Sequence, residues 1–251
     1  SPVTQDGDDA HKQLNLAMEQ ATKNKADPLL AGQYLHDAYN IAFQMGDYPL
    51  AKKLLASSVS QGVELAVWDN VALAEIFARE GDYEKAKGRL SFAINSFKAG
   101  KCLSDPLWKK FLSALENQSQ DKIAAILGSG DGPALLQTNP TVPATHKLSD
   151  VTFTSRDASL PKEIAVNLVI DARGRVQCVT LAAEDKQHSK MLLAMKTRNF
   201  KPAKVGDKSV WQYGKTYVVQ FREGNEMVME EMRSQHGKVF ERAPIIRPKS
   251  H

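Results

Sequence analysis

The side chains best suited to proton transfer or metal binding are six scattered histidines: His11, His36, His146, His188, His236 and His251. None of them belongs to an HExxH pattern, and the chain has no GxSxG elbow, Walker loop or dinucleotide fingerprint. Two pairs of adjacent acids, Glu184–Asp185 and Glu230–Glu231, lie in polar contexts typical of a solvated face. The sequence therefore predicts no catalytic residue, no cofactor and no metal site, and we expect the protein not to be an enzyme.

The two cysteines, Cys102 and Cys178, do not form a CxxC motif, so neither a zinc site nor a thioredoxin-like site is predicted. Two interpretations stay open. The residues are either two buried thiols or one disulfide that joins the two halves of the chain in an oxidising compartment. The glycines of GSGDG at 128–132 follow a helix-like segment, which indicates a helix end and a linker rather than a phosphate loop.

A basic stretch, AMKTRNFKPAKVGDKSV at residues 194–210, has the composition of a nucleic-acid surface around Phe200. Charge is also uneven along the chain. Residues 1–145 hold 14 Lys/Arg against 17 Asp/Glu, a balance of −3, and residues 146–251 hold 19 against 12, a balance of +7. Because the basic residues fall on polar positions between apolar ones, we interpret them as the exposed side of a structural join. No nucleic-acid partner is predicted.

Hydrophobic spacing divides the chain into two parts. Apolar residues recur every three or four positions in GQYLHDAYNIAFQMG and DNVALAEIFAREG, which predicts helices. KEIAVNLVID alternates from Ile164 to Ile170 and predicts a strand. A second strand follows a turn at 172–175, then a helix from Lys186 to Asn199, and then a third strand through SVWQYGKTYVVQF.

The predicted fold class is therefore multidomain. An all-α helical-repeat domain covers residues 1–127, a Gly/Pro linker covers 128–147, and an α+β domain with β-β-α-β order covers 148–251. The tail of this second domain is expected to be helical, because Met229, Met232, His236 and Val239 have near-helical spacing. No apolar run is long enough to span a membrane.

An internal repeat occurs in the first part: GDYPLAKKLL at 46–55 is echoed by GDYEKAKGRL at 81–90. Glycine allows the turn, Asp47 and Asp82 can cap the following helix, and Ala51 and Ala86 are small enough for helices to cross closely. A period near 34 residues is typical of tetratricopeptide helix pairs, and the chain resembles that family. A third helix pair is expected from Asp105 to Leu127, and a capping helix from Asp9 to Lys23.

The resemblance to tetratricopeptide repeats implies a concave groove that is lined by the first helix of each pair and binds a peptide. Counting back from the turn glycines places eight residues in that groove: Gln33, His36, Asn40, Gln44, Trp68, Val71, Glu75 and Arg79. The competing interpretation is that these are ordinary solvated or inter-repeat residues.

The second part resembles the C-terminal domain of TonB-type energy transducers. The residues that carry the match are Ile170, Asp171, Gly174, Val176, Ala194, Phe200, Pro202, Ala203, Gly206 and Val210. The family's opening Tyr-Pro pair is absent. The resemblance implies a periplasmic setting and a last strand that is an edge, to which a partner peptide adds as a further strand. The partner-binding residues predicted on that strand are Trp211, Tyr213, Lys215, Tyr217 and Val219.

The function predicted from both resemblances is that of a non-enzymatic periplasmic adaptor associated with TonB-dependent transport. Its partners would be other cell-envelope proteins, such as a TonB-dependent receptor or inner-membrane transport components, and the resemblance also allows a homodimer. The chain shows no signal peptide, and an anchor upstream of it stays open. The alternative is a structural envelope scaffold that binds peptidoglycan or a secretion complex.

Overall fold

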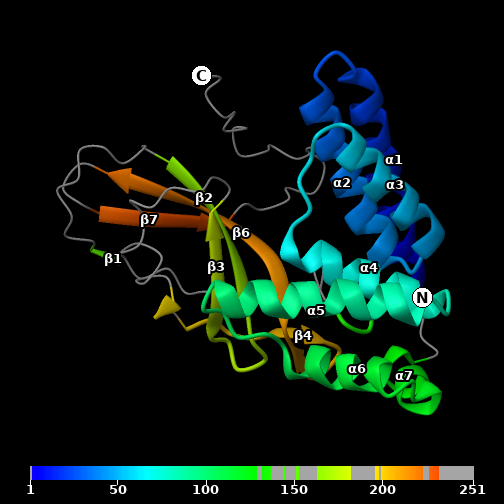
Figure 1. Cartoon of the computed structure of the whole chain (residues 1–251). Coiled ribbons are helices and arrows are strands. Elements are labelled where there is room, and N and C mark those ends of the chain that lie inside the picture. Colours follow the sequence, from blue (N-terminus) through cyan, green and yellow to red (C-terminus); the bar gives the residue numbers. More distant parts are fainter. Residues whose placement is uncertain are drawn as a thin grey trace. The chain divides into compact units, whose positions relative to one another are not determined.

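A computed structural model describes residues 2–128, 132–136, 144, 151–152, 163–181, 196–197, 199–222 and 226–231. The chain divides into two compact units, Ser1–Thr138 and Asn139–His251, which we call the helical unit and the sheet unit. The N-terminal part is rich in helices and the C-terminal part contains a small sheet, as the hydrophobic spacing predicts (Figure 1).

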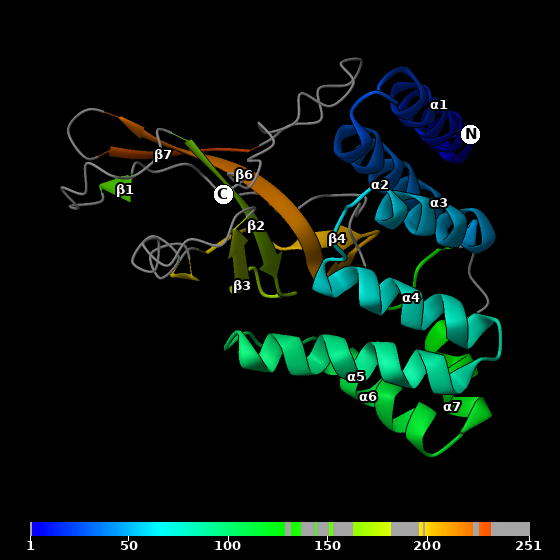
Figure 2. The same cartoon turned by 45° about the horizontal axis from the view of Figure 1, so that its top comes forward.

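The described helices of the helical unit are α1 (Pro2–Lys23), α2 (Pro28–Gln44), α3 (Tyr48–Ser60), α4 (Val67–Arg79), α5 (Tyr83–Ala99), α6 (Pro106–Glu116) and α7 (Gln120–Leu127). Neighbouring helices pack on one another, and α4 and α5 lie side by side in both views of the molecule (Figure 2). None of the helices in this described part combines the length and apolarity that crossing a membrane requires.

The internal repeat is visible as two matching turns. Gly46 and Gly81 have φ angles of 80° and 82°, a region that favours glycine. The side chains of Asp47 and Asp82 then accept hydrogen bonds from the amides of Leu50 (3.1 Å) and Lys85 (3.2 Å) at the starts of α3 and α5. The predicted turn and capping roles of these residues are confirmed.

The third predicted helix pair is also present, as α6 and α7. The Asp105 side chain caps α6 by accepting a hydrogen bond from the Leu107 amide at 2.8 Å, and Pro106 occupies the first turn. Ala51 and Ala86 are fully buried, as expected for close helix crossings, and the largest buried side chains of this unit include Tyr39, Phe43, Trp108 and Phe111.

The sheet unit contains a five-stranded antiparallel sheet in the order β1-β7-β6-β2-β3. Its strands are β1 (Val151–Thr152), β2 (Glu163–Ile170), β3 (Val176–Leu181), β6 (Gln212–Arg222) and β7 (Glu226–Glu231). A separate hairpin is formed by β4 (Ala203–Val205) and β5 (Lys208–Val210). The helix expected from Lys186 to Asn199 lies almost entirely outside the described residues.

The expected helical tail is wrong where the structure describes it, because residues 226–231 form strand β7 rather than a helix. A short segment such as EMVMEE fits both a strand and a helix by periodicity alone. Pairing with β6, from Tyr217↔Glu231 to Arg222↔Glu226, selects the strand. Met232, His236 and Val239 lie outside the described residues.

The turn between β2 and β3 is organised by Asp171, whose side chain is 5% exposed. Its Oδ1 accepts hydrogen bonds from the amides of Arg173 (2.8 Å) and Arg175 (2.9 Å). Its Oδ2 accepts from the Arg175 side chain (3.0 Å) and from the Gln177 amide group (2.7 Å). Burial alone would raise the pKa of Asp171, but these hydrogen bonds outweigh it and hold the pKa below its usual value.

We expect the stabilisation of the fold by the Asp171 carboxylate to be lost in acid. Since the pKa of Asp171 is lower in the folded state, its carboxylate stabilises the fold fully above the unfolded-state pKa, and this stabilisation is lost as pH falls through the folded value. Asp171→Asn should therefore lower the free energy of unfolding at pH 7 and lower it less at pH 3. Urea unfolding of the sheet unit at both values measures this, with Asp207→Asn in the exposed β4–β5 turn as the control. An equal loss at both values would contradict the prediction.

Candidate functional site

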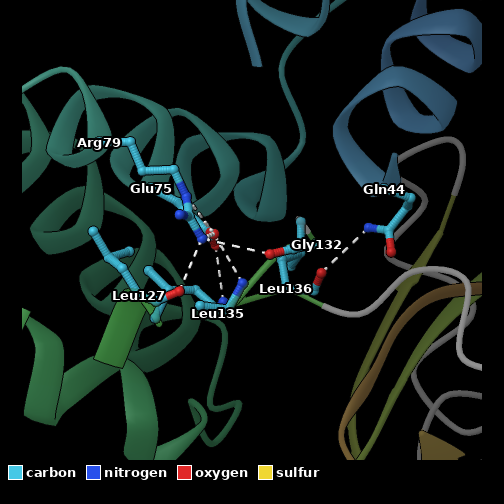
Figure 3. Close-up of polar contacts among 8 residues, drawn as sticks. Gln44, Glu75, Arg79, Leu127, Gly132, Leu135 and Leu136 are labelled. Carbon is cyan, nitrogen blue, oxygen red and sulfur yellow. Dashed lines mark hydrogen bonds and ion pairs between the residues drawn. The ribbon is translucent and has the colours of Figure 1, made fainter. Parts of the chain in front are cut away.

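The centre of the candidate site is Glu75, a fully buried residue of α4. Each carboxylate oxygen accepts a main-chain hydrogen bond, Oε1 from the Ala134 amide at 2.8 Å and Oε2 from the Leu135 amide at 2.9 Å (Figure 3). Ala134 and Leu135 are not part of a helix or strand, so their amides depend on such side-chain acceptors. Glu75 therefore binds two consecutive main-chain donors of one non-helical segment.

Arg79, one turn further along α4, balances the charge of Glu75. Its Nη2 and Nε lie 2.8 and 3.2 Å from Glu75 Oε1, and its guanidinium lies 4.7 Å from the centre of the Tyr48 ring. Arg79 Nη2 also donates to the main-chain oxygens of Leu127 at 3.0 Å and Gly132 at 3.4 Å. A buried carboxylate is tolerated when a cation and hydrogen bonds satisfy it, and Arg79 supplies that cation.

Two further side chains bind the same segment from other helices. Trp108 of α6 donates from Nε1 to the Leu135 oxygen at 2.9 Å, and Gln44 of α2 donates from Nε2 to the Leu136 oxygen at 3.2 Å. The indole of Trp108 is itself held by stacking on Phe97, with ring centres 5.2 Å apart and planes at 3°. We call Gln44, Glu75, Arg79 and Trp108 the clamp, and residues 132–136 the resident segment.

The resident segment was expected to be part of a linker, and the structure corrects this. Residues 132–136 belong to the helical unit, where Pro133, Leu135 and Leu136 are buried. In the sheet unit, the amide of Ala144 donates to Gln212 Oε1 at 2.7 Å, and both residues are buried. The physical reason is that burying apolar side chains such as Leu135 and Leu136 lowers the free energy of the folded protein, even within a Gly/Pro-rich stretch.

Three of the eight predicted groove residues, Gln44, Glu75 and Arg79, belong to the clamp. Trp108 was missed, because the repeat alignment places groove residues only on the first helices of the two clear repeats. Val71 is fully buried and is therefore a core residue rather than a groove residue. Gln33 and Trp68 are half-buried residues of α2 and α4.

His36 and Asn40 form a second polar cluster, around Asp69 of α4. His36 Nε2 lies 2.9 Å from Asp69 Oδ2, and the Asn40 amide nitrogen lies 3.2 Å from His36 Nδ1. Asp69 is fully buried and also accepts from the Ala66 amide at 2.7 Å. Burial raises the pKa of the neighbouring Tyr39, and the charge of Asp69 raises it further. This cluster connects α2 to α4. His36 and Asn40 therefore fit the competing interpretation, in which they make contacts between repeats.

The predicted partner-binding edge of the sheet unit is wrong for the second half of β6, which lies between β2 and β7. β6 pairs with β2 along Gln212–Gln220 and with β7 along Tyr217–Arg222. Of the predicted residues Trp211, Tyr213, Lys215, Tyr217 and Val219, the last two therefore already have strand partners on both sides. Tyr213 is also buried and stacks with Trp211 at 6.3 Å between ring centres.

The reason for this correction is that only three residues separate β6 from β7 in the sequence. A strand that follows so closely can pair with its predecessor at low loop-closure cost, and it covers an edge that would otherwise invite aggregation. Along Tyr217–Arg222, the edge that the resemblance reserves for a partner is occupied by β7 of the same chain.

Comparisons with known proteins give no relative for this chain. No protein-family model matches it, and no match is found among curated proteins or solved structures. The functional argument therefore depends on the geometry of the clamp and on the motifs in the sequence.

Proposed function

We propose that the protein is a non-enzymatic adaptor of the Gram-negative cell envelope, whose helical unit is a divergent tetratricopeptide domain that holds segments of partner proteins. The observation that carries this proposal is the clamp. Its four side chains come from three helices and together bind five main-chain atoms of one non-helical segment. Side chains that recognise main-chain atoms can bind a peptide without catalysing any reaction of that peptide.

The sheet unit is proposed to be a divergent TonB-type C-terminal domain, which assigns the protein to the periplasm and its partners to transport across the outer membrane. Two observations support this. Strands β2 and β3 form a hairpin, and the third predicted strand, β6, returns to pair with the other side of β2, which gives the order β3-β2-β6. The motif residues Gly174 and Phe200 are joined by a hydrogen bond of 2.7 Å from the Phe200 amide to the Gly174 oxygen.

Retention of envelope proteins by the immobilised full chain tests the proposal. Glu75→Gln keeps the shape of the side chain but replaces one acceptor oxygen with an NH₂ donor, so it can serve only one of the two amides. We expect this variant to retain specific partners at least tenfold less well than the unchanged chain, as quantified by mass spectrometry.

Glu80→Gln is the matched control, because Glu80 makes an exposed pair with Lys52 at 2.7 Å and takes no part in the clamp. If the unchanged chain retains no envelope protein, the adaptor function is wrong. If purified cell wall retains the chain and Glu75→Gln has no effect, the protein is the structural scaffold of the alternative hypothesis.

A further inference from the structure

We infer that the resident segment is an internal substitute for the ligand, and that the partner's segment shares its chemistry: a proline, a small residue and two consecutive leucines, without charge. This inference rests on the proposed function of the helical unit as a peptide-binding module. It adds what the bound peptide must look like and how the site is kept closed before the partner arrives.

The polar contacts between the clamp and the resident segment all go to main-chain atoms. Glu75 accepts from the amides of residues 134 and 135, whereas Arg79, Trp108 and Gln44 donate to the oxygens of residues 132, 135 and 136. Along the segment the clamp therefore meets one oxygen, then two consecutive N–H donors, then two consecutive oxygens, in a fixed register. Another peptide that follows the same backbone path could satisfy every one of these contacts, so the clamp is not specific to this covalent chain.

Selectivity must then come from the side chains of the bound segment. Leu135 and Leu136 are 2% and 0% exposed, and Pro133 is buried, whereas Ala134 is half-buried and Gly132 is exposed. Burying two leucine side chains is favourable because it removes apolar surface from water, while a charged side chain there would lose its hydration. An acidic residue would also lie near the carboxylate of Glu75. The favoured ligand is therefore apolar at these positions.

The covalent connection makes the resident segment a strong competitor. It begins five residues after Leu127, the end of α7, whose main-chain oxygen is held by the same Arg79. A short tether gives an effective concentration of the order of millimolar, so an external peptide must exceed this to displace the segment. The apparent affinity for a partner equals the intrinsic affinity multiplied by the fraction of molecules in which the site is open.

A synthetic peptide of residues 131–137, Asp-Gly-Pro-Ala-Leu-Leu-Gln with blocked ends, tests the inference on the full chain. In the double variant Leu135→Ser, Leu136→Ser, the resident segment is weakened while the clamp is unchanged. We expect this variant to bind the labelled peptide at least tenfold more tightly than the unchanged chain, as measured by fluorescence anisotropy. Adding Glu75→Gln should abolish the gain.

Methylation of peptide amides supplies a sharper control. Methyl groups on the amides at positions 134 and 135 remove the two donors that Glu75 accepts, and they should weaken binding at least tenfold. A methyl group on the amide at position 137, outside residues 132–136, should have a much smaller effect. Equal binding of both methylated peptides would overturn the assignment of the main-chain contacts.

If the double variant does not fold, as judged by circular dichroism, hydrogen exchange on the unchanged chain decides. Excess unlabelled peptide should speed the exchange of the Ala134 and Leu135 amides of the protein severalfold, because the resident segment is displaced. Unchanged exchange, or a folded double variant that binds the peptide no better, would show that residues 132–136 are only a structural strap. If the peptide binds but no envelope protein is retained, the inference stands and the adaptor function fails.

Discussion

Gly174→Ala is expected to disrupt the β2–β3 turn and to remove hydrogen-exchange protection from both strands. Gly174 has a φ of 82°, and a Cβ atom there would lie 1.8 Å from the main-chain oxygen of Phe200. The obstacle is backbone, which cannot rotate away as a side chain can. The Phe200 amide is bonded to the Gly174 oxygen at 2.7 Å, so separating the two segments also breaks that hydrogen bond.

Gly206→Ala is the matched control, because Gly206 also has a positive φ, of 59°, but a Cβ atom there would meet nothing within 4 Å. The control should cost only the backbone strain of an L-residue, about 1–2 kcal/mol. Gly174→Ala should cost clearly more, and exchange measured on 163–181 should become fast while the helical unit keeps its protection. Equal effects of the two substitutions would show that the approach of Phe200 is not limiting.

Trp108→Ala is expected to have the largest effect on the helical unit. Trp108 is fully buried, stacks on Phe97 and donates to the Leu135 oxygen. Removing a buried tryptophan costs about 3–5 kcal/mol through lost burial and the cavity that remains. The Leu135 oxygen would also lose its donor, so the resident segment should exchange faster than the helices do.

Trp108→Phe separates packing from hydrogen bonding. Phenylalanine keeps an aromatic ring against Phe97 but has no N–H, so it should cost about 1–3 kcal/mol for the unsatisfied carbonyl and the smaller ring. Urea unfolding followed by circular dichroism at 222 nm measures both variants. A phenylalanine variant as unstable as the alanine variant would mean that the hydrogen bond to the resident segment, rather than the packing, carries the stability.

Local patterns in the sequence predicted several features correctly because these depend on few neighbours. The repeated GDY turns, the caps Asp47 and Asp82, the helix pair that follows Asp105, and the strand from Glu163 to Ile170 are all present. Helix caps and turns are decided by residues three or four positions apart. Strand alternation needs only one buried face.

Features that depend on distant parts of the chain were decided only by the tertiary structure. EMVMEE became β7 because β6 offered an unpaired edge beside it, and the same pairing made Tyr217 and Val219 interior positions of the sheet. Hydrophobic spacing has no information about which strand will lie alongside another. It therefore could not show that the expected edge is already covered along Tyr217–Arg222.

The clamp illustrates the same division within one site. The sequence by itself determined that Gln44, Glu75 and Arg79 lie on one face of repeated helices, because helical spacing and the 35-residue offset of the GDY turns require it. Only the tertiary structure decided what they hold, since residues 132–136 are about 60 positions beyond Glu75 and are bound through main-chain atoms. Every residue carries those atoms, so no side-chain pattern could mark the segment as the occupant of the site.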